Sequence, residues 1–168
     1  MMKEIFINND KLKDEEIDED VTRVKSLLIN DKNEILLGYS HNTYQFIGGH
    51  VEKEESLENA LIREIEEESG IKLDHIDSKP FALIKYYSKN YHNSGKNRSN
   101  KIYYYAVNTN AKPKLNNTHY TTCEKDGNFE LRYVNLSDVK RVLVDNNKIS
   151  KYKDIAYEML RILDIYFE

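Results

Sequence analysis

The sequence has little of what disulfide-rich, zinc-clustered or membrane-spanning proteins need. Cys123 is the only cysteine among 168 residues, which excludes an internal disulfide and any zinc site built from several cysteines. A single cysteine also favours a reducing compartment. With two prolines the chain has no proline-rich linker, and no uninterrupted apolar run reaches the roughly 18 residues of a membrane span. We therefore expect a soluble, cytoplasmic protein without a membrane partner.

Charge is nearly balanced overall but concentrated in one segment. The chain carries 25 Lys and Arg against 29 Asp and Glu, and this net charge of −4 is too small to imply a general attraction to nucleic acid or membrane. Residues 49–71, however, hold eight glutamates against Lys53 and Arg63, a local charge of −6. The acidic segment therefore needs its own explanation.

The length and the order of apolar segments indicate one domain. A chain of 168 residues fits a single core, so we expect one domain over 1–168, with a variable lead-in at 1–20 and a helix at 150–168. Apolar, aromatic and β-branched segments, arranged as two hairpins and a later short strand, predict strands at 21–29, 34–39, 81–87, 101–108 and 129–134.

Helices are predicted in two further places. Strong helix formers run without Pro or Gly over 56–69 and are followed by Gly70, a natural stop. A short capped helix is expected at 136–139.

The helix predicted over 56–69 carries carboxylates in an unusual place. At roughly 100° per residue, its apolar residues form one stripe: Leu57, Ala60, Leu61 and Ile65. Three glutamates border or interrupt this stripe: Glu64, Glu67 and Glu68. Glu64 and Glu68 are four residues apart, where like charges destabilise a helix by about 0.2–0.5 kcal/mol. A divalent cation would relieve this repulsion because Mg²⁺ prefers oxygen ligands; the alternative is a solvated acidic face, as for most charge runs.

Two glycines precede this helix, and the spacing after them is specific. Gly48 and Gly49 can adopt backbone angles closed to other residues and let a ligand approach closely. From Gly49 the chain counts five residues to Glu55 and seven more to Arg63-Glu64, followed by Ile65, Glu66, Glu67-Glu68, Ser69 and Gly70-Ile71. Residues 49–71 therefore resemble the Nudix box, and every specified position of that pattern is met.

The resemblance implies an α+β fold, a Nudix-like α/β/α sandwich with a mixed β-sheet. It implies hydrolysis of a pyrophosphate linkage in a nucleoside diphosphate joined to another moiety, with Mg²⁺ or Mn²⁺ as cofactor and a nucleotide-derived diphosphate as partner. The implied metal ligands are the carboxylates of Glu64, Glu67 and Glu68, with the carbonyl of Gly48 as a further ligand.

The resemblance also implies roles outside the metal site. An ion pair between Glu55 and Arg63 would join the loop to the helix. The general base would be Glu64 of the box or a glutamate on a later loop, for which Glu124 and Glu130 are candidates. We predict Glu64 and Glu130 as catalytic, the alternative for Glu130 being an exposed strand carboxylate. The sequence identifies no substrate-binding residue.

The chain departs from the family pattern in three places. Phe46-Ile47 precedes the glycines where Phe-Pro or Leu-Pro is frequent, Glu54 replaces a frequent glycine, and no basic residue follows the segment 35–39. None of these changes removes a metal ligand, but together they leave the substrate open.

Other features keep alternative functions open. Tyrosines and basic residues between 85 and 105 could hold a nucleotide or an RNA end, because aromatic rings stack on bases and cations attract phosphates. The alternative is a hairpin with inward-packed tyrosines and a solvated basic tip. A catalytically silent nucleotide- or RNA-binding module on the same fold is therefore the second hypothesis. Isomerisation of an isoprenoid diphosphate would need a positioned cysteine, and Cys123 lies in a polar loop. The position of cleavage, the number of metal ions and the oligomeric state stay open.

Overall fold

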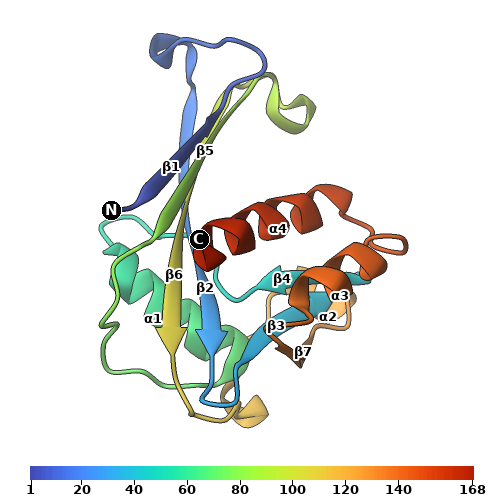
Figure 1. The fold of residues 1–168 in the computed structure, drawn as a ribbon. Helices are drawn as coiled ribbons and strands as arrows, with labels where there is room; N and C mark the ends of the chain where they lie inside the picture. Colours follow the sequence, from blue (N-terminus) through green and yellow to red (C-terminus); the bar gives the residue numbers. More distant parts are fainter.

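One mixed seven-stranded sheet organises the molecule, and helices cover both of its faces (Figure 1). The computed structural model describes all 168 residues. The strands are β1 (Lys3–Ile7), β2 (Glu19–Ile29), β3 (Glu34–Ser40), β4 (Thr43–Phe46), β5 (Ala82–Ser88), β6 (Arg98–Asn108) and β7 (Glu130–Asn135). The α-helices are α1 (Leu57–Ser69), α2 (Thr122–Asp126), α3 (Val139–Asn146) and α4 (Lys153–Phe167).

The strand order is β1-β5-β6-β2-β3-β4, with β7 paired to β3. β2 and β6 form a parallel pair over 11 residues each, β5 and β6 form the predicted antiparallel hairpin, and β1 adds in parallel to β5. β2 and β3 pair only near their shared turn; beyond it the same edge of β3 pairs with β4, while β7 pairs along the other edge of β3. This divergence leaves the edge of β2 free for the segment that follows β4.

Two apolar cores confirm the predicted α/β/α sandwich. One sheet face packs on α1 and the other on α3 and α4. Because side chains alternate along a strand, β2 contributes to both: Leu28 packs towards α1, whereas Leu27 packs with Met159 of α4. The same alternation directs Arg23 and Lys25 to the face covered by α4.

The predicted helix over 56–69 is α1, and its apolar stripe is buried. The Ser56 hydroxyl accepts a hydrogen bond from the Asn59 amide at 3.1 Å, which satisfies one free donor of the first turn. Gly70 ends the helix in the left-handed conformation, with φ 71°. The local signals in this segment are therefore sufficient to place the helix.

Three elements are missing from the sequence prediction, and the last two helices begin later than predicted. β1, β4 and α2 span only four or five residues, too few for a recognisable period. The predicted short helix at 136–139 is wrong in position, because α3 begins only at Val139 and runs to Asn146, and α4 begins at Lys153 instead of Ser150. Ser150 is buried and shares a hydrogen bond with Thr43 at 2.7 Å, so it does not cap the helix.

The lead-in before β2 lies along the loop between β5 and β6, and together they form an arm that projects from the sheet (Figure 1). The Asp18 carboxylate accepts a hydrogen bond from the Asn97 amide at 2.7 Å. Glu19 pairs with both Lys96 and Arg98 at 2.9 Å. The acidic lead-in is therefore ion-paired to the basic loop. No helix in the chain has both the length and the apolar character to cross a membrane.

Candidate active site

The loop after β4 runs along the free edge of β2. The Ser26 amide donates to the Ile47 carbonyl at 2.8 Å, the Val24 amide to the Gly49 carbonyl at 2.9 Å, and the Val51 amide to the Thr22 carbonyl at 2.9 Å. These bonds hold residues 47–51 like an added strand. The backbone of the two glycines is therefore fixed by the sheet rather than by a proline.

Both glycines lie at close approaches, and at Gly48 the approach excludes any side chain. Gly48 has a φ of 141°, and a Cβ there would lie 2.1 Å from the Val24 carbonyl oxygen, so no other residue fits. A Cβ on Gly49 would lie 2.5 Å from the carboxylate oxygens of Glu64. The absent side chains let the loop backbone meet the carboxylates of α1 directly.

Glu68 is the most buried carboxylate of the site, with 5% of its surface exposed. Its Oε2 accepts a hydrogen bond from the Gly48 amide at 2.9 Å. Its pKa is raised to about 8, chiefly by burial and to a smaller extent by the nearby Glu124 and Glu64 carboxylates, while the Lys25 ammonium and the Gly48 hydrogen bond act in the opposite direction. The raised pKa favours the neutral form of Glu68, which would lessen the repulsion expected between Glu64 and Glu68.

Arg63 gathers the other carboxylates. Its guanidinium binds Glu55 through two hydrogen bonds of 2.9 and 3.0 Å, which confirms the predicted loop-to-helix ion pair. It also contacts Glu64 at 2.9 Å and Glu67 at 3.4 Å, and it donates to the His50 carbonyl at 2.8 Å. Burial nevertheless raises the pKa of Glu64, and its hydrogen bond to Arg63 acts in the opposite direction.

The donor set fits a divalent metal ion. Glu64, Glu67, Glu68 and Gly48 line one cleft of about 580 Å³, and carboxylate and carbonyl oxygens are the ligands that Mg²⁺ and Mn²⁺ prefer. The acidic side chains are not preassembled as a metal cluster, because Arg63 holds Glu64 and Glu67. A metal ion bound by these two carboxylates would compete with their contacts to Arg63.

Residues 21–154 match the NUDIX domain family. The chain belongs to the Nudix family. Its members are pyrophosphohydrolases that typically depend on a divalent metal ion, and no curated protein sequence matches this chain.

Solved structures of similar fold align with most of this chain. The MutT protein from Methanosarcina mazei Go1 is 18% identical, with a TM-score of 0.57 over 89% of this chain and 96% of that one. A MutT structure described for Aliivibrio salmonicida and Vibrio cholerae is 19% identical, with a TM-score of 0.54 over 85% and 94%. The Ap4A hydrolase of C. elegans in a binary complex is 20% identical, with a TM-score of 0.53 over 87% and 94%. These likenesses concern the fold.

The cleft of the Nudix domain also contains residues that the sequence analysis does not identify. Arg23 and Lys25 of β2 lie in it, as does His41, which follows β3. The Lys25 ammonium donates to the carbonyls of Gly48 at 2.9 Å and Phe46 at 3.1 Å. The available signal was two basic residues two positions apart, just before the apolar end of the strand. They supply the positive charge that the segment 35–39 lacks.

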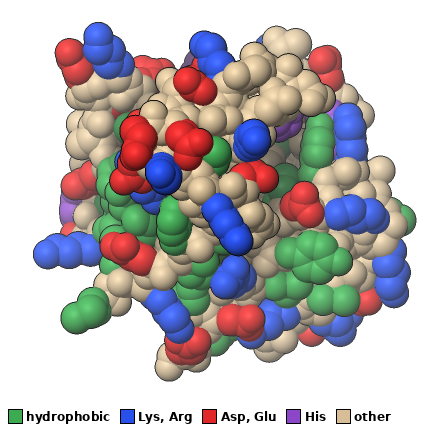
Figure 2. All heavy atoms as spheres, turned by 90° about the horizontal axis from the view of Figure 1, so that it is seen from above, with side chains coloured by type: hydrophobic (Ala, Val, Ile, Leu, Met, Phe, Trp, Pro, Cys, Tyr) green, Lys and Arg blue, Asp and Glu red, His purple; other side chains and the backbone are tan.

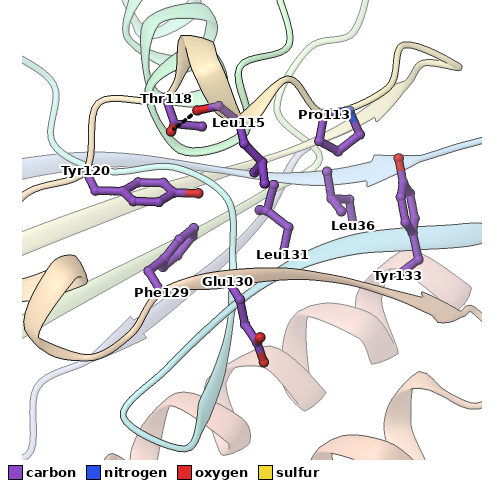
Figure 3. Close-up of a pocket in the computed structure, with 9 residues that line it drawn as sticks. All are labelled: Leu36, Pro113, Leu115, Thr118, Tyr120, Phe129, Glu130, Leu131 and Tyr133. Carbon is purple, nitrogen blue, oxygen red and sulfur yellow. Dashed lines mark hydrogen bonds between the residues drawn. The ribbon is translucent and has the colours of Figure 1, made fainter.

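The two candidate bases on later segments lie in different places. Glu124 of α2 lines the cleft of the Nudix domain, as does the adjacent Cys123. Glu130 is at the start of β7, where it pairs with Arg132, and it borders a separate apolar pocket of about 510 Å³. Figure 3 shows its carboxylate pointing away from the ring of Phe129 and the other apolar side chains. The fold brings Glu124 to the cleft and does not bring Glu130 there.

The aromatic and basic residues between 85 and 105 are largely engaged within the Nudix domain. The Arg98 guanidinium lies 4.1 Å from the ring centre of Tyr91 while it pairs with Glu19. The Lys85 ammonium lies 4.5 Å from the ring centre of Tyr87. Seen from the end of the arm, acidic and basic side chains are intermixed over the surface (Figure 2). This arrangement favours a packed hairpin over an RNA-binding surface.

Proposed function

We propose that this Nudix domain hydrolyses a pyrophosphate linkage in a nucleoside diphosphate joined to another moiety, with Mg²⁺ or Mn²⁺ as cofactor. The proposed ligands are Glu64, Glu67, Glu68 and the carbonyl of Gly48. The observation that supports this most is their position in one cleft with Lys25, because an anionic substrate needs positive charge there. When bound, the ion would neutralise charge on the phosphate oxygens.

Basic groups of β2 would position the phosphates. The Lys25 ammonium is fixed by two backbone carbonyls, so it presents its remaining donor at a defined point of the cleft. His50 would add no charge, because burial and then the nearby Arg23 and Lys25 lower its pKa. Its ring nitrogen lies 3.1 Å from Nη2 of Arg23 and can accept a hydrogen bond from it. These contacts hold the cationic groups in place before a substrate binds.

A carboxylate of the cleft would take the proton from the attacking water. Burial raises the pKa of Glu64 and so increases its proton affinity towards neutral pH, where a general base is most effective. We propose Glu64 as the base and Glu124 as the second candidate. Glu130, predicted as catalytic from the sequence, would have no direct contact with a substrate in this cleft.

Product release from a panel of nucleotides tests the proposed function. The panel contains nucleoside triphosphates, nucleotide sugars and dinucleoside polyphosphates, the last also because an Ap4A hydrolase shares the fold. We expect activity on at least one class that requires Mg²⁺ or Mn²⁺ and is abolished by EDTA. Metal-dependent turnover of none of them would reject the hydrolase.

A pair of variants on one helix tests the ligand assignment. Glu68→Gln should keep the fold but lower kcat by about 100-fold or more, as removal of one group that stabilises transition-state charge typically does. Glu66→Gln is the matched control, because Glu66 lies on α1 outside the cleft and pairs with Lys72 at 3.5 Å. Equal rates for both variants would refute the assignment of Glu68.

The second hypothesis, a nucleotide-binding module without turnover, is supported by one observation. The Lys25 ammonium already donates a hydrogen bond to the Gly48 carbonyl, so the cleft contains a positive charge without a metal ion. Nucleotide binding that persists in EDTA without any product release would establish this alternative.

A further inference from the structure

The outer edge of β7 has no partner strand. β7 pairs with β3 along one side, and no other strand pairs with it. The Leu136 amide donates to the Asn33 carbonyl at 2.9 Å, which fixes the alternation of backbone bonds along this antiparallel pair. The even-numbered residues of β7 therefore direct their N–H and C=O groups to β3, whereas Leu131 and Tyr133 direct theirs away from it. These two residues present a free hydrogen-bonding edge.

An apolar pocket of about 510 Å³ lies beside this edge, on the sheet face covered by α1. Figure 3 shows Leu131 and Tyr133 on one side of β7, together with Leu115 and Pro113, and the Glu130 carboxylate on the opposite side. Leu115 is 66% exposed and Tyr133 is 40% exposed. Exposed apolar side chains next to unpaired backbone groups favour pairing with another strand. The edge is therefore suited to receive a strand.

The residue order of β7 fits a second copy of the same strand. A two-fold axis perpendicular to the sheet makes two β7 strands antiparallel and keeps each face of the sheet on its own side. When Leu131 lies opposite Leu131 of the second copy, Glu130 lies opposite Arg132 of the second copy, and this pair of opposite charges occurs twice. A shift of two residues in either direction places Arg132 opposite Arg132 or Glu130 opposite Glu130, which is unfavourable. Charge therefore selects one register.

The charged side chains are held in place before any association. The Arg132 guanidinium lies 3.5 Å from the ring centre of Tyr39 and donates to the Tyr44 hydroxyl at 3.2 Å. It also pairs with Glu130 of its own strand. Because these contacts already restrict both side chains, little conformational entropy is lost when they pair across the axis.

On the face covered by α1, the same register brings apolar groups together. Tyr133 lies opposite Phe129 of the second copy, and the two pockets come to lie on either side of the axis, where their exposed walls lose contact with water. The Phe129 amide already donates to the Glu124 carbonyl at 2.9 Å, so its N–H needs no further partner. The strand pairing is therefore confined to residues 129–133.

We propose that two copies of this chain associate through β7 as antiparallel strands, with Leu131 opposite Leu131 and Glu130 opposite Arg132 of the second copy. Glu130 and Arg132 are then interface residues. The edge lies outside the cleft, so this inference does not rest on the proposed function. Because the paired segment is short, the interface is small and the association is weak.

Sedimentation velocity of the full chain between about 1 and about 300 µM tests the proposal. We expect a monomer–dimer equilibrium with a Kd of about 1–100 µM. Glu130→Arg and Arg132→Glu should each raise this Kd by about 10-fold or more, because two like-charge contacts replace two ion pairs. An equimolar mixture of the two variants should associate about as tightly as the wild type, because both facing pairs are again opposite in charge. An ion pair within one chain cannot produce this result.

A substitution at Tyr133 tests the backbone edge separately. Tyr133→Pro removes an N–H that points away from β3, so the ladder to β3 should be kept while the Kd of the dimer rises by about 10-fold or more. Tyr133→Val is the matched control, since it keeps both the N–H and a residue that favours strands, and its Kd should stay within about 3-fold of the wild type. Circular dichroism of dilute samples checks that both variants are folded.

Three outcomes would overturn the proposal. The first is a wild-type chain that stays monomeric at the highest concentration, including one that binds an extended peptide at β7 instead of a second copy. The second is a dimer whose Kd is unchanged in Glu130→Arg, Arg132→Glu and Tyr133→Pro. The third is a mixture of the two charge variants that does not associate, and this test decides even if Tyr133→Pro does not fold.

Discussion

Lys25 donates a hydrogen bond of 2.9 Å to the carbonyl oxygen of Gly48, the oxygen proposed as a metal ligand. A positively charged group therefore lies where the loop backbone presents its partial negative charge to the cleft. The same ammonium opposes the rise in the pKa of Glu68. On the proposed function, Lys25 would compete with the metal ion for this carbonyl and would also attract the anionic substrate.

Replacement of Lys25 should separate these two effects. Lys25→Met should strengthen Mn²⁺ binding to the nucleotide-free protein by about 3- to 10-fold, because a nearby like charge is removed. The same change should raise KM for a nucleotide substrate by about 10-fold through loss of a charge-assisted phosphate contact. Calorimetry and steady-state kinetics measure the two values. Unchanged metal affinity together with unchanged KM would exclude Lys25 from the site.

Glu68 should make the stability of the metal-free protein depend on pH. Its folded pKa of about 8 lies above its ordinary value of 4.5, so its stabilising contribution is complete below pH 4.5 and is lost as pH rises to 8. Glu68→Gln stays neutral and can keep the bond to the Gly48 amide. We expect its stability relative to the wild type to increase by about 1–3 kcal/mol between pH 5 and pH 8. Urea unfolding in EDTA checks this; an equal difference at both pH values would contradict it.

The three glutamates considered as bases should respond differently to amide substitution. Glu64→Gln should remove most activity and the acidic limb of the pH profile of kcat. Glu124→Gln should cause a smaller loss, about 10-fold, because Glu124 lies in the cleft on another element. Glu130→Gln should remain within about 2-fold of the wild type, since its carboxylate pairs with Arg132 outside the cleft. A loss of more than 10-fold in Glu130→Gln would move the base to β7.

Glu54 should weaken the loop before α1. It has a φ of 65°, the left-handed region that favours glycine, which explains why many family members carry glycine at this position. Glu54→Gly should raise the free energy of unfolding by about 0.5–1 kcal/mol. Lys53→Gly is the matched control, because Lys53 is the exposed neighbour of Glu54 and has no positive φ. Glycine at this position should lower the free energy of unfolding, because it increases the conformational entropy of the unfolded chain. Equal destabilisation by both changes would show that Glu54 is not strained.

Much of the candidate site could be predicted because its residues interact locally. The interval between Glu64 and Glu68 is one helical turn, so their shared face follows from helix geometry alone. The pair of Glu55 and Arg63 spans one loop and the start of α1, and it is present as predicted. Glu130 shows the limit of such reasoning. The positions of Glu124 and Glu130 in the sequence do not indicate whether α2 or β7 reaches the cleft.

The order of residues in the segment 49–71, with Ser56 and Gly70 at the ends of α1, was sufficient to establish the family, the helix and its acidic face, because these depend on contacts within a few turns. Tertiary structure alone placed Lys25 on the Gly48 carbonyl and left the outer edge of β7 without a partner strand, and it alone separated Glu124 from Glu130. The physical reason is that strands pair with partners far away in the chain, and the order and register of that pairing are settled by the packing of the whole sheet.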